Sequence, residues 1–91
     1  MNALHIRIHG SVQGVWFRQS TVEAVQKIGG ITGYVKNEPD GTVFIHVEGE
    51  ETKLKKFISW CQKGAPLSRV DQVQTQKVEE KGFENFQIRF R

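Results

Sequence analysis

The stretch LHIRIHGSVQGVWFR, from Leu4 to Arg18, passes from a strand pattern through a glycine-bearing loop to the start of a helix. Apolar and polar residues alternate from Leu4 to His9, which is the period of a half-buried strand. From Arg18 to Ile28 the apolar residues recur instead at helical spacing, and Gly29-Gly30 ends that pattern. We therefore expect a strand and a helix joined by a tight loop.

The rest of the chain repeats these two patterns. Leu54, Phe57, Ile58 and Cys61 form the apolar stripe of a second helix, for which Thr52 is the candidate N-cap and Gly64 and Pro66 the end. The other elements are predicted by short alternating or apolar runs and by one turn that contains proline and glycine. These are strands over 31–37, 43–49, 70–78 and 86–91, with the turn at 38–41. We expect Asp40 and Thr42 to stabilise this turn.

The predicted order is β-α-β-β-α-β, with a further strand segment at the carboxyl end. In this split arrangement two helices cover one face of an antiparallel sheet. A chain of 91 residues has room for one hydrophobic core, so we expect a single α+β domain over residues 1–91.

Composition limits the function classes. The net charge of +3 is mild and its lysines and arginines are scattered, which favours small anionic ligands over nucleic acid. No apolar run approaches the roughly 20 residues needed to cross a bilayer, and the amino terminus lacks a signal-peptide pattern. We therefore expect a cytoplasmic protein with no membrane partner. We also expect a monomer, although no pattern in the sequence determines the oligomeric state.

Metal binding is not expected. Cys61 is the only cysteine, so neither an intrachain disulfide nor a cysteine cluster can form, and a buried core thiol is the prediction. His5, His9 and His46 lie on strands at positions opposite in parity to the core residues, so we expect them on an open face of the sheet. Their spacing matches no known ligand set.

The loop from Gly10 to Arg18 is a candidate anion site. Glycine at positions 10 and 14 would let consecutive N–H groups turn toward one centre, and the following helix start adds unpaired N–H groups. Arg18 adds a planar fork that can hold two phosphate oxygens. The alternative is that these glycines serve a purely steric role, with Val12, Val15 and Phe17 packed inward as anchors.

Two blocks of the sequence resemble the signatures of the acylphosphatase family. The first is IHGSVQGVWFR, Ile8–Arg18, with the core G-x-V-Q-G-V-x-F-R, and the second is GYVKNEPDGTV, Gly33–Val43, followed by Glu48-Gly49. The similarity continues through Trp60 and the segment 64–70 to Phe86 and Ile88. It therefore covers nearly the whole chain.

The resemblance implies a ferredoxin-like α/β sandwich that hydrolyses the carboxyl–phosphate bond of acyl phosphates without a metal or other cofactor. It also implies that Arg18 binds the phosphate and that Asn37 orders the attacking water. Backbone N–H groups would complete the phosphate cradle, and they belong to Gln13, Gly14, Val15, Trp16, Phe17 and Arg18.

This chemistry needs few groups. An acyl phosphate leaves as a carboxylate whose conjugate acid has a pKa of roughly 4, so no general acid is required. Positioning and electrostatics dominate phosphoryl transfer. Asn37 can hydrogen-bond the water but cannot take its proton, so we expect the substrate phosphate or bulk water to accept it.

Two features depart from the common family pattern. The interval from Arg18 to Asn37 is one residue longer than usual, and we place the extra residue at Gly29-Gly30, away from the loop. Trp16 occupies a slot where a smaller residue is frequent, which leaves the range of acyl groups open. The rival hypothesis is a noncatalytic small-anion or RNA-binding module on the same fold.

Overall fold

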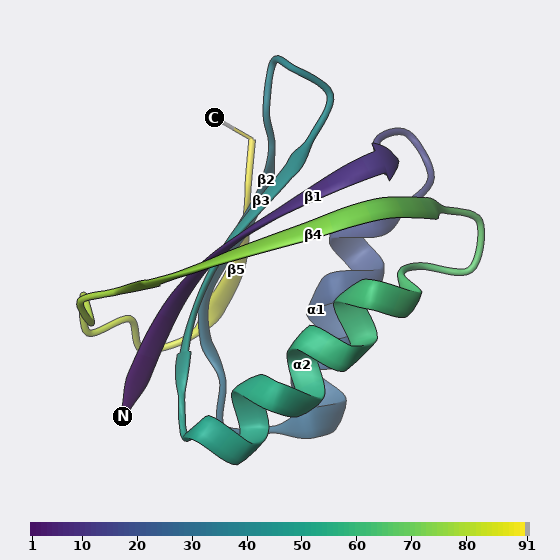
Figure 1. Cartoon of the computed structure of the whole chain (residues 1–91). Helices are drawn as coiled ribbons and strands as arrows, with labels where there is room; N and C mark the ends of the chain where they lie inside the picture. Colours follow the sequence, from purple (N-terminus) through teal and green to yellow (C-terminus); the bar gives the residue numbers. More distant parts are fainter. Residues whose placement is uncertain (91) are drawn as a thin grey trace.

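The computed structural model describes residues 1–90, and its helices and strands follow the predicted order (Figure 1). Arg91, the last residue of the predicted final strand, lies outside the described residues. The elements are β1 (Asn2–Ser11), α1 (Phe17–Ile28), β2 (Thr32–Asn37), β3 (Val43–Gly49), α2 (Glu51–Lys63), β4 (Arg69–Val78) and β5 (Phe86–Arg89).

The strands form one sheet in the order β4-β1-β3-β2-β5. β1 pairs antiparallel with β3 and β4, and β2 pairs antiparallel with β3. β5 pairs parallel with β2, so the sheet is mixed rather than wholly antiparallel. The reason is that the chain crosses from the β4 edge to the β2 edge before β5 begins, which reverses the direction of the last strand. The predicted arrangement is otherwise confirmed.

Both helices lie on one face of the sheet and enclose the core (Figure 1). Alternate residues of the central strands point into it, as the period of their sequences predicts, and α2 contributes the predicted side chains Leu54, Phe57 and Cys61. Cys61 is a buried core thiol as expected, and burial raises its pKa. Neither α1 nor α2 is long and apolar enough to span a bilayer.

Both helix starts differ slightly from the prediction. α1 begins at Phe17, one residue before Arg18. The N-cap of α2 is Glu50, not Thr52, and no side chain caps the helix there. The N–H of Leu54 donates to the carbonyl of Glu50, which starts the helix directly after β3 and turns its apolar stripe toward the sheet.

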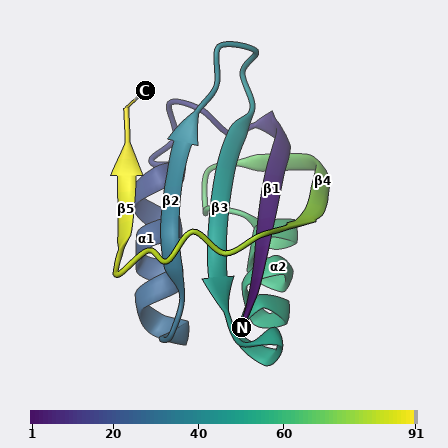
Figure 2. The same cartoon turned by 90° about the vertical axis from the view of Figure 1, so that its left-hand side faces the viewer.

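The face of the sheet opposite the helices is not open at its centre. Residues 79–85 cross it on the way from β4 to β5 (Figure 2). The backbone N–H groups of Lys81 and Gly82 donate to the carboxylate of Glu48, and the ring of Phe83 lies 5.2 Å from that of His46. The predicted exposure of His46 is therefore wrong, because the crossing segment covers it. Within residues 1–90, no three histidine, cysteine or acidic side chains are grouped as metal ligands.

Candidate active site

Three segments that are distant in sequence meet at one end of the sheet. β1, β2 and β5 run in the same direction, so their carboxyl ends lie together (Figure 2). The loop of residues 12–16 follows β1, Asn37 ends β2, and Phe90 follows β5. The sheet topology therefore assembles the predicted phosphate loop and the predicted asparagine at one place.

Gly10 has a steric role rather than a role in the loop. It lies within β1, where the register with β4 shifts, and a Cβ at this position would lie 2.0 Å from the carbonyl oxygen of Arg69. Only glycine permits this close approach of the two strands. The steric alternative therefore accounts for glycine at position 10, because close packing of β1 against β4 leaves no room for a Cβ.

The loop itself has the backbone of an anion nest. Gly14 has φ 74°, and Trp16 has φ 60° and ψ 24°, the left-handed conformation, directly before the helical residue Phe17. A left-handed residue next to a right-handed one turns successive N–H groups toward one side, which forms an anion-binding concavity. In the part of the chain that the structure describes, none of the N–H groups from Gln13 to Arg18 donates to a backbone carbonyl.

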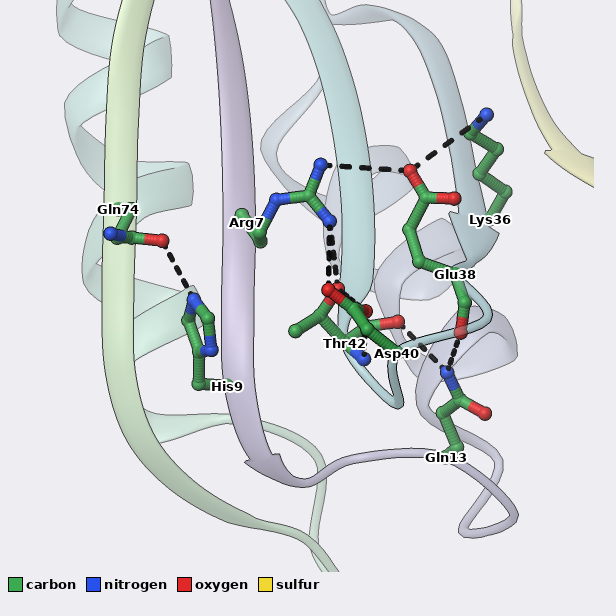
Figure 3. Close-up of polar contacts among 8 residues, drawn as sticks. All are labelled: Arg7, His9, Gln13, Lys36, Glu38, Asp40, Thr42 and Gln74. Atoms are coloured by element: carbon green, nitrogen blue, oxygen red, sulfur yellow. Dashed lines mark hydrogen bonds and ion pairs between the residues drawn. The ribbon is translucent and has the colours of Figure 1, made fainter.

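Two buried side chains and one glutamine hold the loop. Val12 and Phe17 are almost wholly buried, as predicted. The side-chain amide of Gln13 donates to the carbonyl oxygens of Glu38 at 2.8 Å and Thr42 at 2.9 Å, and so ties the loop to the β2–β3 turn (Figure 3). These two hydrogen bonds are not predictable from local sequence, because the acceptors lie 25 and 29 positions away.

The β2–β3 turn is itself braced. Asp40 accepts hydrogen bonds from the N–H and hydroxyl of Thr42, which confirms the predicted turn role of both residues. Arg7 donates to the Thr42 hydroxyl at 2.9 Å and lies 3.6 Å from the carboxylate of Glu38 (Figure 3). Gln13 therefore attaches the loop to a rigid structure.

Arg18 and Asn37 line the same cavity, which has a volume of about 480 Å³. The guanidinium carbon of Arg18 lies 5.0 Å from the centre of the Phe90 ring, and none of the ion pairs found within residues 1–90 involves Arg18. The side-chain oxygen of Asn37 is buried, and no hydrogen-bond partner for it is found among the described residues. The full lining is Val12, Gly14, Trp16, Phe17, Arg18, Gln19, Asn37, Ile88 and Phe90.

These features define an α+β sandwich with a site suited to a small anion at a strand–loop–helix junction. The acylphosphatase family model matches residues 4–88, and the chain belongs to this family. The predicted family resemblance is thereby confirmed.

Individual relatives agree with this assignment. The chain is 44% identical to an acylphosphatase from Thermotoga petrophila over 90 residues, which covers 99% of each chain. It is also 44% identical to an acylphosphatase from Archaeoglobus fulgidus, over 99% of this chain and 100% of the relative. The crystal structure of acylphosphatase from Bacillus subtilis superposes with a TM-score of 0.94 at 33% identity, covering 99% of this chain and 100% of that one.

The family and these relatives make the chain an acylphosphatase, a hydrolase, as the sequence predicts. They also confirm the ferredoxin-like fold. None of the relatives described above favours the noncatalytic binding module.

Proposed function

We propose that the chain hydrolyses acyl phosphates at the cavity between the loop and Asn37. Arg18 and the N–H groups of residues 13–18 hold the phosphoryl group and balance its charge. Asn37 accepts a hydrogen bond from the attacking water through its side-chain oxygen. The observation that carries the proposal is that Arg18, residues of the nest and Asn37 line one cavity. The side-chain oxygen of Asn37 also has no hydrogen-bond partner among the described residues.

In the proposed reaction the water oxygen attacks phosphorus in line with the acyl oxygen. The bond between phosphorus and that oxygen breaks, and its electron pair leaves with the carboxylate. A proton of the water passes to a phosphate oxygen, because the amide of Asn37 has no basic site at neutral pH. The products are the free carboxylate and inorganic phosphate, and no metal takes part in the scheme.

Hydrolysis of acetyl phosphate in the presence of a chelator tests these roles. We expect Arg18→Ala to lose both phosphate binding and turnover, because the guanidinium group supplies the positive charge and also orients the phosphoryl group. Asn37→Ala should mainly lower kcat, by a factor of about 10²–10³, as for other oriented hydrogen-bonding groups. Inhibition by inorganic phosphate measures binding separately from turnover.

Arg69→Ala serves as the matched control, because Arg69 is exposed and pairs only with Asp71 among the described residues. Near-normal hydrolysis by Asn37→Ala would contradict the role of Asn37. A natural chain that binds phosphate but hydrolyses no acyl phosphate would favour the noncatalytic module instead.

The remaining parts of the proposal rest on the sequence. We propose one domain over residues 1–91, a monomer in the cytoplasm, and no nucleic-acid partner. The length of 91 residues supports a single domain. The scattered basic residues and the mild net charge of +3 support the absence of a nucleic-acid partner. Analytical ultracentrifugation tests the oligomeric state directly.

A further inference from the structure

We propose that Trp16 and Phe90 form an aromatic subsite for the acyl group, so that this acylphosphatase prefers aryl-substituted acyl phosphates over short alkyl ones. The inference rests on the proposed function, because it takes the phosphoryl group to lie in the loop. It adds the substrate class and names the side chains that select it.

Trp16 is not explained by the fold. Its backbone is left-handed, with φ 60°, a conformation that disfavours bulky residues, and 79% of its surface is exposed. The indole therefore gains little from packing within the protein while its backbone carries strain. Strained residues of this kind cluster at ligand sites, where contact with the ligand rather than the fold explains them.

Phe90 contributes the second ring. It is also 79% exposed, and it lines the same cavity as Trp16. The exposed large apolar side chains of the described chain are Met1, Trp16, Leu67 and Phe90, and two of these four line this one cavity. Exposed apolar side chains gathered beside a few polar groups are typical of small-molecule sites.

The chemistry of the substrate places its acyl group beside these rings. In an acyl phosphate a single oxygen joins the phosphorus to the carbonyl carbon, so the acyl substituent must lie next to the phosphate cradle. Arg18 is the only charged residue among those lining the cavity, and the phosphoryl group engages it. The rest of the lining therefore suits an uncharged acyl group, and a volume of about 480 Å³ accommodates an aryl ring with a phosphate.

The test compares benzoyl phosphate with acetyl phosphate through the ratio of their kcat/KM values. Comparing this ratio between natural and variant chains cancels the different intrinsic reactivities of the two substrates. We expect the ratio to fall about tenfold in Trp16→Gly, since an aromatic contact contributes about that factor. Glycine is chosen because it tolerates the left-handed backbone, and Trp16→Phe should restore most of the ratio.

Leu67→Ala is the matched control, because Leu67 is 76% exposed and does not line the cavity. It should leave the ratio and both rates unchanged. An active Trp16→Gly variant with the natural ratio would overturn the subsite and leave the proposed function intact. A natural chain that hydrolyses neither substrate would refute the proposed function itself.

Binding without turnover provides a second measurement. Phenacylphosphonate and acetonylphosphonate carry a methylene in place of the bridging oxygen, and calorimetry gives the affinity of the natural chain and of Phe90→Ala for each. We expect the natural chain to bind the phenacyl compound about tenfold more tightly, and Phe90→Ala to lose most of that preference. Equal affinities of the natural chain for both compounds would overturn the inference even if Trp16→Gly failed to fold.

Discussion

The backbone of residue 16 has a conformation that glycine adopts readily and tryptophan does not. Trp16 stands at the N-cap of α1 with φ 60° and ψ 24°, and its side chain makes no capping hydrogen bond. The buried side chains of Val12 and Phe17 anchor the loop at its two ends, and Trp16 lies directly before Phe17. The loop thus keeps its anion-nest geometry at a local cost in free energy of about 1–2 kcal/mol.

This cost can be measured with two variants. We expect Trp16→Gly to be more stable than Trp16→Ala by about 1 kcal/mol, because alanine keeps the left-handed strain and glycine removes it. Urea unfolding gives the two free energies of unfolding. Glu23, which is exposed in the middle of α1, is the control: there Ala should be more stable than Gly by about 0.5–1 kcal/mol. The same sign at both positions would show that residue 16 carries no strain.

The candidate site divides at the residue scale into what local sequence predicts and what it does not. The predicted roles of Val12, Phe17 and Gly14 follow from apolarity and from the need for positive φ. The left-handed Trp16 and the side-chain bonds of Gln13 do not follow. Both depend on the position in which the β2–β3 turn and the core hold the loop. The local sequence does not predict that position.

One buried carboxylate binds the segment of residues 79–85 to the sheet. Glu48 is 3% exposed, accepts N–H donors from Lys81 and Gly82, and lies 2.7 Å from the ring nitrogen of His46. Burial alone would raise the pKa of the Glu48 carboxyl, but these hydrogen bonds outweigh burial and lower the pKa below its ordinary value of 4.5. Glu48 is therefore ionised in the folded chain at neutral pH.

The lowered pKa makes stability depend on pH in a defined direction. Because the folded pKa is below the unfolded one, the contribution of Glu48 is present above pH 4.5 and is lost as the pH falls through the folded pKa. We expect the free energy of unfolding to fall below pH 4.5, and to fall less steeply in Glu48→Gln. Urea unfolding across this range measures both slopes.

Glu23→Gln is the control, because Glu23 is an exposed residue of α1 and its removal should leave the slope unchanged. His5 contributes separately at higher pH. Burial and the charges of His46 and Lys81 lower the pKa of His5 below 6.5, so its contribution is present above pH 6.5 and is lost as the pH falls from there through the folded pKa. An identical acid slope in Glu48→Gln and the natural chain would contradict the role of the carboxylate.

At the element scale, the periodicity of apolar residues predicts where strands and helices occur. It does not predict which segments pair with the strands or cover the faces of the sheet. Leu4 to His9 and Val43 to Val47 alternate, and both lie in strands. The parallel pairing of β5 and the crossing segment that buries His46 were not predicted. Both arise from contacts between the end of the chain and strands far earlier in it, such as Gly33 paired with Phe86.

At the scale of the whole molecule, the core shields the single thiol, that of Cys61, from solvent. Cys61 is fully buried within the core, and burial raises its pKa, while only the thiolate reacts quickly with disulfide reagents. We expect labelling with Ellman's reagent to be slow in the native state and to accelerate with denaturant in parallel with unfolding. The labelling rate would then report global opening.

Ser59→Cys in a Cys61→Ala background provides the comparison. Ser59 is exposed on the same helix, so its thiol should react at once without denaturant. Rapid labelling of Cys61 in the native natural chain would instead indicate that α2 opens locally.

The pairing of β1 with β4 has a consequence for how the protein is made. Ala3 pairs with Val78, so β1 has one edge that cannot be paired until β4 has emerged from the ribosome. The β2–β3 hairpin and both helices are complete before then. Pairings between distant segments form slowly because they close long loops. Between the emergence of β1 and that of β4 the chain therefore exposes an unpaired strand edge, and chaperone binding or aggregation would compete with folding in that interval.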